Sequence, residues 1–152
     1  MRTFCEREFA NRGLNTHWTQ HNHTLTSHRG SVRGMHWQAD PKPEIKLVRC
    51  IAGAVLDVIV DIRPNSETFG QWTSVELSAE NHRAVYIPYG FAHGFQCLAE
   101  SCELMYLMSE FYDPKLARGV RCDDPQIGIK WPLPILNLSE RDQSLPLLSE
   151  MS

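Results

Sequence analysis

The chain has no long hydrophobic run, no excess of positive charge and no apolar leader at its start. Its longest apolar run, residues 52–60, contains Asp57 and is far shorter than the roughly 20 residues that cross a bilayer, so we expect no transmembrane segment. The formal net charge of −3 provides no overall positive field for a nucleic acid, so any phosphate recognition must be local. The first residues, MRTFCEREFANRG, include acidic side chains and do not resemble a secretory signal. We therefore expect a cytoplasmic protein that binds neither nucleic acid nor membrane.

Closely spaced cysteine pairs are also missing. The chain has five cysteines, an odd number, and none of them forms a CxxC motif, which argues against a zinc knuckle and against a complete disulfide framework. We interpret all five as reduced thiols that are mostly buried. They are Cys5, Cys50, Cys97, Cys102 and Cys122.

What the sequence does contain is a series of short β-branched and aromatic runs. Between about Lys46 and Met108 these runs are divided by Gly, Pro, Asn and Ser, a pattern typical of an all-β sandwich or barrel. The segment KLVRCIAGAVLDVIVDI predicts two strands that meet at Gly53. Further strands are expected at residues 73–77, 84–87, 94–98 and 103–108. The architecture that fits these elements is a double-sheet jelly roll in one domain spanning residues 1–152.

Helices are expected only at the periphery. One is predicted over residues 4–11, ended by Gly13, and a short one opens at Ser139, whose hydroxyl suits an N-cap. The proline-rich segment WPLPILNLSERDQSLPLLSE is expected to wrap around the sandwich rather than to form a domain of its own.

Two residues with reactive side chains lie within predicted strands. Lys46 shares a strand face with Val48 and Cys50, so either this lysine points inward or, on the other face, Arg49 does. A solvent-facing strand end is the competing interpretation for Lys46. Tyr106 can be an acid, although a buried tyrosine more often packs its ring and forms a hydrogen bond with its hydroxyl.

Histidines raise the possibility of a metal centre. His36 lies in RGMHWQ, and His93 lies in IPYGFAHGF, whose PxGxxH resembles the second conserved motif of metal-binding cupins. Such a centre needs HxH in the first motif, but Gln38 stands where the second histidine is required, which leaves only His36, His93 and Glu44 as candidate ligands. The HNH at residues 21–23 has the right spacing but precedes the motif, in what we expect to be a loop. We therefore expect no metal.

Without a metal, the remaining side chains suit proton transfer. His36 offers a base, Lys46 a cation, Tyr106 a phenol and Asp142 a carboxylate. Removing a proton next to a ketone requires a base, a positive charge or donor for the enolate oxygen, and an acid on the opposite face if the centre is to be inverted. A carboxylate that binds the imidazole fixes its tautomer.

Longer segments of the sequence resemble one family. RGMHWQ, KLVRCIAGAVLDVIVDIRPNSETFGQW, VELSAENHRAVYIPYGFAHGF, ELMYLMSEFYDP and RCDDPQIGIKWPL are together similar to dTDP-4-dehydrorhamnose 3,5-epimerases, in register from about Asn22 to Leu148. The resemblance implies a cupin jelly roll, a homodimer, no cofactor and proton transfer next to the 4-keto group of a nucleotide-linked 6-deoxy sugar.

By position, the resemblance also assigns roles. It implies that His36 is the base and Asp142 its partner, that Lys46 stabilises the enolate, and that Tyr106 is the opposite-face acid. It places the phosphate-binding arginine at Arg33. It places other residues of the substrate pocket at His93, Asn22, Gln38 and Tyr112.

The beginning of the chain departs from the family pattern. About 25 residues that carry a second diphosphate-binding arginine and contribute to the dimer are expected before Met1 in the family. Arg2 and Thr3 stand near the position of a glutamate that reaches the neighbouring site in rhamnose-pathway enzymes. These departures affect three expected properties: the affinity for the nucleotide, dimerisation and the identity of the sugar product.

Three functions compete at this point. The first is epimerisation at C3, C5 or both carbons of a nucleoside-diphosphate 4-keto-6-deoxy sugar through an enolate. The second is a nucleotide-sugar 3,4-ketoisomerase, against which the presence of both Lys46 and Tyr106 argues. The third is a cupin that binds a sugar or nucleotide without catalysis, which has no need of the complete set of proton-transfer residues.

Overall fold

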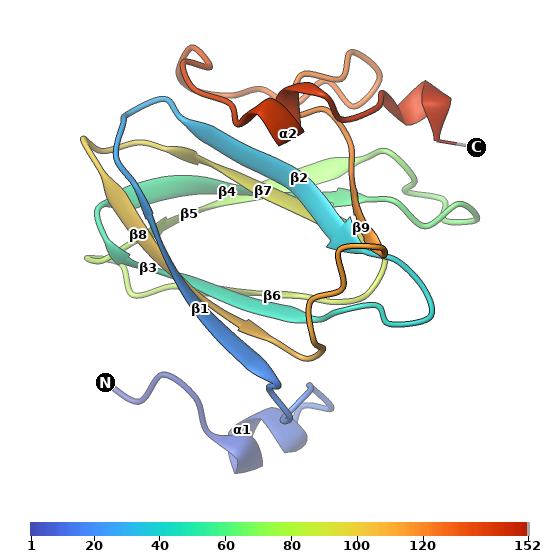
Figure 1. The fold of residues 1–152 in the computed structure, drawn as a ribbon. Helices are drawn as coiled ribbons and strands as arrows, with labels where there is room; N and C mark the ends of the chain where they lie inside the picture. Colours follow the sequence, from blue (N-terminus) through green and yellow to red (C-terminus); the bar gives the residue numbers. More distant parts are fainter. Residues whose placement is uncertain (152) are drawn as a thin grey trace.

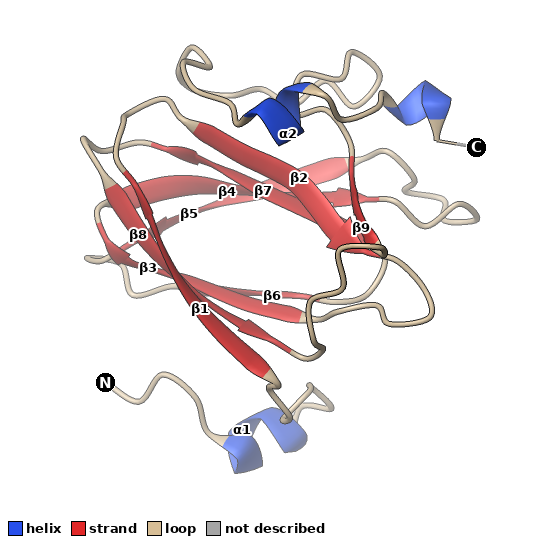
Figure 2. Cartoon of the chain, in the orientation of Figure 1, coloured by secondary structure: helices blue, strands red, loops and turns tan. Residues whose placement is uncertain are grey.

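Two antiparallel β-sheets face each other in the computed structural model, which describes residues 1–151 (Figure 1). One sheet has four strands in the order β1-β8-β3-β6, and the other has five in the order β5-β4-β7-β2-β9. Figure 2 shows that helix is confined to short segments outside the sheets, so the prediction of an all-β fold with peripheral helices is confirmed.

Each sheet is built mainly from strands that are not consecutive in the sequence. The four-stranded sheet contains β1 (Gln20–Thr26), β3 (Lys46–Ala52), β6 (Ala84–Ile87) and β8 (Cys102–Met108). The five-stranded sheet contains β2 (Val32–Gln38), β4 (Ala54–Asp61), β5 (Trp72–Ser78), β7 (Phe91–Cys97) and β9 (Ala117–Gly119).

The strands expected between residues 46 and 108 are all present, with bounds that differ by up to three residues. β3 and β4 meet at Gly53, as predicted. Gly53 has φ 72°, and a Cβ at this position would lie 2.2 Å from the carbonyl oxygen of Ser101. Only glycine fits here, because both the left-handed backbone and the close approach exclude a side chain. The chain can therefore cross from one sheet to the other in a single residue.

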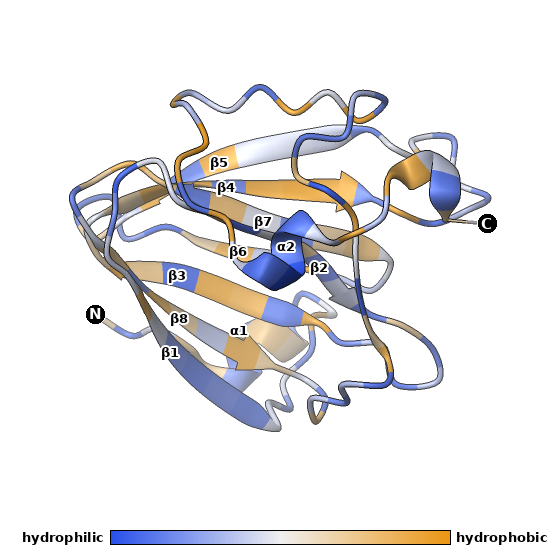
Figure 3. Cartoon of the chain, turned by 45° about the horizontal axis from the view of Figure 1, so that its top comes forward, coloured by the Kyte–Doolittle hydropathy of each residue, from blue (hydrophilic) through white to orange (hydrophobic). Residues whose placement is uncertain are grey.

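The prediction of a loop for residues 21–23 was wrong. These residues lie within β1, which pairs along its whole length with β8. β2 and β9 also lie outside the range in which strands were expected. β1 has only one apolar residue, Leu25, because it is an edge strand, and Figure 3 shows it as largely hydrophilic. Such a strand lacks the apolar alternation on which sequence-based assignment depends.

Two hydrophobic clusters hold the layers together. The first fills the space between the sheets with residues such as Val48, Phe95 and Leu104. The second lies on the outer face of the five-stranded sheet, where Val58 and Val60 pack against residues of the C-terminal segment. Figure 1 shows that segment, in orange and red, lying over this sheet. The prediction that the C-terminal segment wraps around the sandwich is therefore confirmed.

Three short helical segments lie outside the sheets. α1 (Glu6–Ala10) is shorter than predicted and lies beside the four-stranded sheet on its outer side (Figure 1). α2 (Glu140–Gln143) opens as expected at Ser139, whose Oγ accepts a hydrogen bond of 3.0 Å from the backbone N–H of Asp142. A 3₁₀ turn, η1 (Leu148–Glu150), was not predicted. Among residues 1–151, none of the helices has the length and apolar character needed to span a membrane.

The cysteines follow the prediction of reduced and mostly buried thiols. Within residues 1–151 all five are free, four are buried, and Cys5 is partly exposed.

Candidate active site

A β-bulge in β2 brings Arg33 and His36 to the same face of the five-stranded sheet. In a regular strand, residues three apart point to opposite faces. Here Arg33 pairs with Phe95 and His36 pairs with His93, so that three steps on β2 match two on β7. Gly34 lies in the bulge with φ 116°, and a Cβ there would approach the Cα of Gly94 to 2.6 Å. Both side chains therefore face the interior between the sheets.

His36 is held by a carboxylate from the C-terminal segment. Its Nε2 lies 2.5 Å from Oδ1 of Asp142 in α2, although the two residues are 106 positions apart in the chain. The other carboxylate oxygen, Oδ2, accepts a hydrogen bond of 3.3 Å from the backbone N–H of Gly34. When Nε2–H donates to Asp142, the lone pair of a neutral imidazole lies on Nδ1, which leaves that atom free to accept a proton.

The environment of Asp142 keeps this carboxylate charged. Burial by itself would raise its pKa, but the hydrogen bond and the Coulombic attraction of His36 outweigh burial, with help from Gly34 and Ser139. The pKa of Asp142 therefore lies below its usual value.

Lys46 lies inside the sandwich and not at a solvent-facing strand end. Its side chain is only 12% exposed, and its Nζ lies 3.0 Å from Oε1 of Glu44, which is equally buried. Lys46 pairs with Met108 on β8, which places it next to the Tyr106–Val48 pair on the inner face of the four-stranded sheet. Glu44, considered above as a metal ligand, instead balances the charge of this lysine.

Tyr106 is partly buried on the inner face of β8. Burial is the main reason that its pKa is raised, the negative charge of Asp57 adds to the effect, and a hydrogen bond with Thr24 opposes it. Its hydroxyl therefore stays protonated across the physiological pH range. The other predicted acid–base residues enter the same interior from different strands: His36 from β2 and Lys46 from β3.

The residues predicted to line the substrate pocket differ in their exposure and in their contacts. Asn22 is the cross-strand partner of Tyr106 and shares its sheet face, but it is exposed on the edge strand. The guanidinium of Arg33 donates 3.0 Å and 3.4 Å hydrogen bonds to the carbonyls of Val32 and Asn137. Gln38 is buried, and its amide binds the backbone at three places in the loops that follow β2 and β8. Tyr112 is exposed, so only its location in the loop after β8 relates it to the site.

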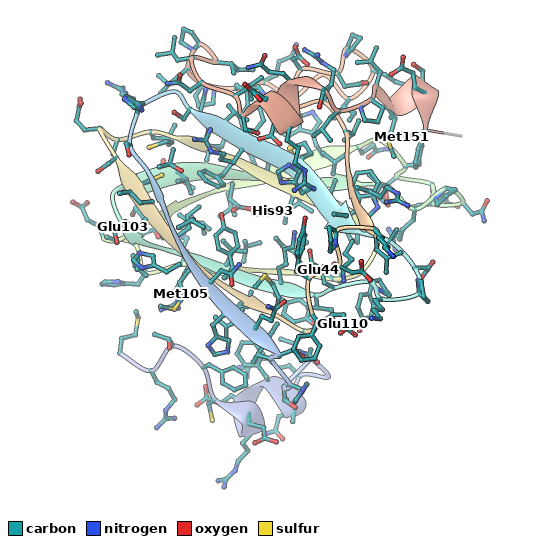
Figure 4. All side chains as sticks on the ribbon, in the orientation of Figure 1. Glu44, His93, Glu103, Met105, Glu110 and Met151 are labelled. Atoms are coloured by element: carbon teal, nitrogen blue, oxygen red, sulfur yellow. The ribbon has the colours of Figure 1, made fainter. Side chains whose placement is uncertain are left out.

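His93 is part of a second histidine–carboxylate pair that the sequence did not reveal. Its Nε2 lies 2.7 Å from Oδ2 of Asp57, which lies in the middle of β4. Figure 4 shows His93 between the two sheets. The single charged residue in the apolar run 52–60 was a signal for Asp57, because an isolated carboxylate in a buried strand requires a partner.

A separate hollow lies away from these pairs. A hollow of about 790 Å³ opens at the end of β2 and is lined by residues that include Trp37, Tyr89 and Arg118. Of the predicted site residues only Gln38 contributes to its wall. We place the candidate active site at the histidine–carboxylate pairs, because they supply an oriented imidazole for proton transfer and the lining of the hollow contains no histidine.

Within residues 1–151, no three His, Cys, Asp or Glu side chains are arranged so that they could hold a metal ion. His36 and His93 each direct Nε2 to a carboxylate instead.

The two-sheet sandwich with an inward-facing His-Asp pair defines a cupin jelly roll, and comparisons with known proteins support this class. The family model described as dTDP-4-dehydrorhamnose 3,5-epimerase matches residues 1–150, so the similarity extends well before Asn22. The chain belongs to this family.

Individual relatives agree. The dTDP-4-dehydrorhamnose 3,5-epimerase of Methanothermobacter thermautotrophicus is 46% identical over 153 residues, a match that covers 99% of this chain and 82% of the relative. The Legionella pneumophila dTDP-6-deoxy-D-glucose-3,5-epimerase, solved with dTDP-4-keto-L-rhamnose, has a TM-score of 0.94 at 38% identity and covers 99% and 80% of the two chains. ChmJ, a 3'-monoepimerase from Streptomyces bikiniensis solved with dTDP-quinovose, has a TM-score of 0.91 at 38% identity and covers 97% and 75%.

Proposed function

We propose that the protein is an epimerase that inverts C3, C5 or both carbons next to the ketone of a dTDP-linked 4-keto-6-deoxy sugar. The observation that carries this proposal is the His36–Asp142 pair, which faces the same interior as Tyr106 and Lys46 in a member of the epimerase family. The substrate and the reaction in this proposal are those that the names of the relatives describe.

The residues provide both proton transfers. Nδ1 of His36 takes the proton from the carbon next to the ketone, the C–H electron pair forms the enolate, and Nζ of Lys46 stabilises the oxygen. Tyr106 then gives its hydroxyl proton to the opposite face of the same carbon, which restores the ketone with inverted configuration. The imidazolium and the tyrosinate return to their starting states by exchanging protons with water.

Arg33 is proposed to bind the diphosphate. It faces the interior on the same side of β2 as His36, and its guanidinium can bind phosphate oxygens through two hydrogen bonds. Asn22, Gln38, His93 and Tyr112 are proposed to complete the substrate pocket.

We also infer that the protein forms a homodimer in the cytoplasm through the outer face of the four-stranded sheet. Leu25 on β1 is 63% exposed and Ile51 on β3 is 39% exposed, and Figure 4 shows Met105 of β8 on the side away from the second sheet. Exposed apolar side chains gathered on one face are typical of an interface. Sedimentation of the protein should show a dimer that Leu25→Glu converts to a monomer.

Proton NMR of dTDP-4-keto-6-deoxyglucose in heavy water tests the function directly. With the protein present, the signals of the protons next to the ketone should disappear through exchange, and signals of inverted product should grow. The number of exchanged positions also distinguishes one inverted centre from two. An unchanged spectrum at high protein concentration would contradict the proposal.

A further inference from the structure

The Asp57–His93 pair has no part in the proton transfers described above. Asp57 is fully buried, His93 is 5% exposed, and Oδ2 of Asp57 lies 2.7 Å from Nε2 of His93. The second carboxylate oxygen, Oδ1, is buried and has no hydrogen-bond partner within residues 1–151. A buried carboxylate with one unsatisfied oxygen destabilises the fold, and apolar residues at both positions would avoid this cost. The pair therefore calls for an explanation beyond stability.

The neighbour that explains the pair is Tyr106. The rings of His93 and Tyr106 meet edge to face, with centroids 6.1 Å apart and an angle of 73° between their planes. The imidazole is thus fixed on one side by the carboxylate of Asp57 and packs on the other against the phenol. Asp57, His93 and Tyr106 come from β4, β7 and β8, so the contact joins the two sheets.

We propose that Asp57 is a positioning residue for the opposite-face acid: through His93 it fixes the ring of Tyr106 in the place from which the phenol hydroxyl gives its proton to the enolate. This inference rests on the proposed function, because it assigns Asp57 to the same reaction. The two histidine–carboxylate pairs then have different tasks. Asp142 prepares the base, and Asp57 prepares the acid.

The groups around Tyr106 determine whether the loss of the Asp57 charge raises or lowers the pKa of the phenol. Charges come from Asp57 on β4 and Arg33 on β2, and Lys46 on β3 lies next to the Val48–Tyr106 pair. Uncharged neighbours are the thiol of Cys102 on β8, the hydroxyl of Thr24 on β1 and the imidazole of His93 on β7. Burial raises the pKa of Tyr106 most, Asp57 and Cys102 raise it further, and Thr24 and Arg33 lower it. Replacing the charge of Asp57 by a neutral group must therefore lower the pKa of Tyr106. A tyrosine with a lower pKa loses its proton at a lower pH. The rate of inversion should therefore begin to fall at a lower pH in the variant than in the wild-type protein.

Asp57→Asn tests the inference, because the amide oxygen still accepts a hydrogen bond from His93 while the charge is lost. The matched control is Asp124→Asn, since Asp124 is another buried carboxylate, bonded to backbone N–H groups of Gln126, Ile127 and Leu148. Tyrosines labelled with ¹³C at Cζ are titrated by NMR, and the Tyr106 signal is the one that Tyr106→Phe removes. Its pKa should fall in Asp57→Asn and stay unchanged in Asp124→Asn.

The second readout is the ratio of inversion to deuterium entry in heavy water. Because His36 is unaffected, Asp57→Asn should keep exchange within a few-fold and lower inversion by about tenfold, a part of the 10²–10⁴ that a general acid contributes. The alkaline limb of inversion should also move to lower pH. An unchanged Tyr106 titration, or equal losses of exchange and inversion, would overturn the inference and leave the pair a structural one.

A further variant covers the case in which Asp57→Asn does not fold. The side chain in His93→Gln can still donate a hydrogen bond to Asp57, but the variant removes the ring that packs on Tyr106. The ratio of inversion to deuterium entry should therefore fall again. An unchanged ratio would contradict the positioning role. If the wild-type protein neither exchanges nor inverts the substrate, the proposed function is wrong. The tyrosine titration then still decides whether Asp57 controls the ionisation of Tyr106.

Discussion

The two ends of the sandwich interior differ although the same three strands build both. Along β3, β7 and β8 the inward residues run from Lys46, His93 and Tyr106 at one end to cysteines at the other. Between them lie apolar residues, and the inward residues of these stretches are Lys46, Val48 and Cys50; His93, Phe95 and Cys97; Tyr106, Leu104 and Cys102. Each strand thus passes from a reactive group through one apolar side chain to a thiol.

The difference shows how one core can serve both chemistry and stability. At the first end, each carboxylate meets a basic side chain: Asp142 meets His36, Asp57 meets His93 and Glu44 meets Lys46, at 2.5–3.0 Å. At the second end, burial is the chief cause that raises the pKa of both Cys50 and Cys102, so these thiols stay neutral and behave as small hydrophobic residues. The apolar residues in the middle separate the two environments.

The largest effect is expected from removing the base at the reactive end. His36→Asn should lower deuterium entry and inversion together by about 10³-fold, because no other group at this position takes the proton. The dissociation constant for dTDP should change only a few-fold, since the lost interaction belongs to the transition state. Steady-state kinetics and calorimetry measure the two quantities. His28→Asn, in the exposed turn between β1 and β2, is the control. A variant at His36 that turns over at nearly the wild-type rate would refute its assignment as the base.

The next effect separates the two proton transfers. Tyr106→Phe removes only the hydroxyl, so inversion should fall by about 10²-fold while His36 still exchanges the substrate proton for deuterium. NMR in heavy water follows both processes in one sample, and Tyr89→Phe, at a half-exposed tyrosine, is the control. Equal losses of exchange and inversion would mean that the hydroxyl has only a structural role.

The middle of the interior should matter for stability and not for chemistry. Leu104→Ala removes a side chain that is 1% exposed, and this should lower the free energy of unfolding by about 3 kcal/mol. Urea denaturation measures the loss, and Leu136→Ala at a largely exposed position should change it by less than about 0.5 kcal/mol. Turnover per folded molecule at 25 °C should stay close to wild type. A large loss of turnover in fully folded protein would show that the two ends are not independent.

A smaller effect is expected where the substrate's phosphates are proposed to bind. Arg33→Lys should raise KM about tenfold and lower kcat less than threefold, because an ammonium group cannot reproduce the two hydrogen bonds of a guanidinium. Arg29→Lys, in the exposed turn before β2, provides the comparison. The reverse pattern, with kcat lowered and KM kept, would place Arg33 among the residues that act on the reacting carbon.

No effect is expected from chelators. Gln38 stands where a metal-binding cupin requires a second histidine, and its amide is used to hold backbone groups. Activity after dialysis against EDTA should therefore equal that of untreated protein, and added zinc should not increase it. A stoichiometric metal whose removal abolishes turnover would overturn this prediction.

The sequence predicted the fold well wherever strands alternate or glycine marks a turn. The junction at Gly53 and the cap at Ser139 were predicted from local chemistry, and the structure contains both. β1 was missed because its outward residues meet solvent at a sheet edge, so it has no apolar stripe. Local patterns fail where the partner strand, and not the segment itself, decides the conformation.

For the candidate site, too, some features were predicted from the sequence and others were not. Residue types and the family resemblance indicated His36, Lys46, Tyr106 and Asp142, and the structure brings Asp142 to His36 across 106 positions of the chain. The bulge that turns Arg33 and His36 to one face was not predicted, because it depends on the approach of Gly34 to Gly94. Asp57 was also missed, since only the folded sandwich shows which histidine it meets.

The position of Asp142 has a consequence for the timing of activity during synthesis. His36 lies in β2, but its carboxylate partner belongs to α2, in the segment that covers the five-stranded sheet after all nine strands. A ribosome-bound chain in which strands β1 to β9 have already paired still lacks the carboxylate that we propose orients the base. The proposed activity therefore depends on the segment after β9, and protein synthesis delays the reaction until this segment covers the sandwich.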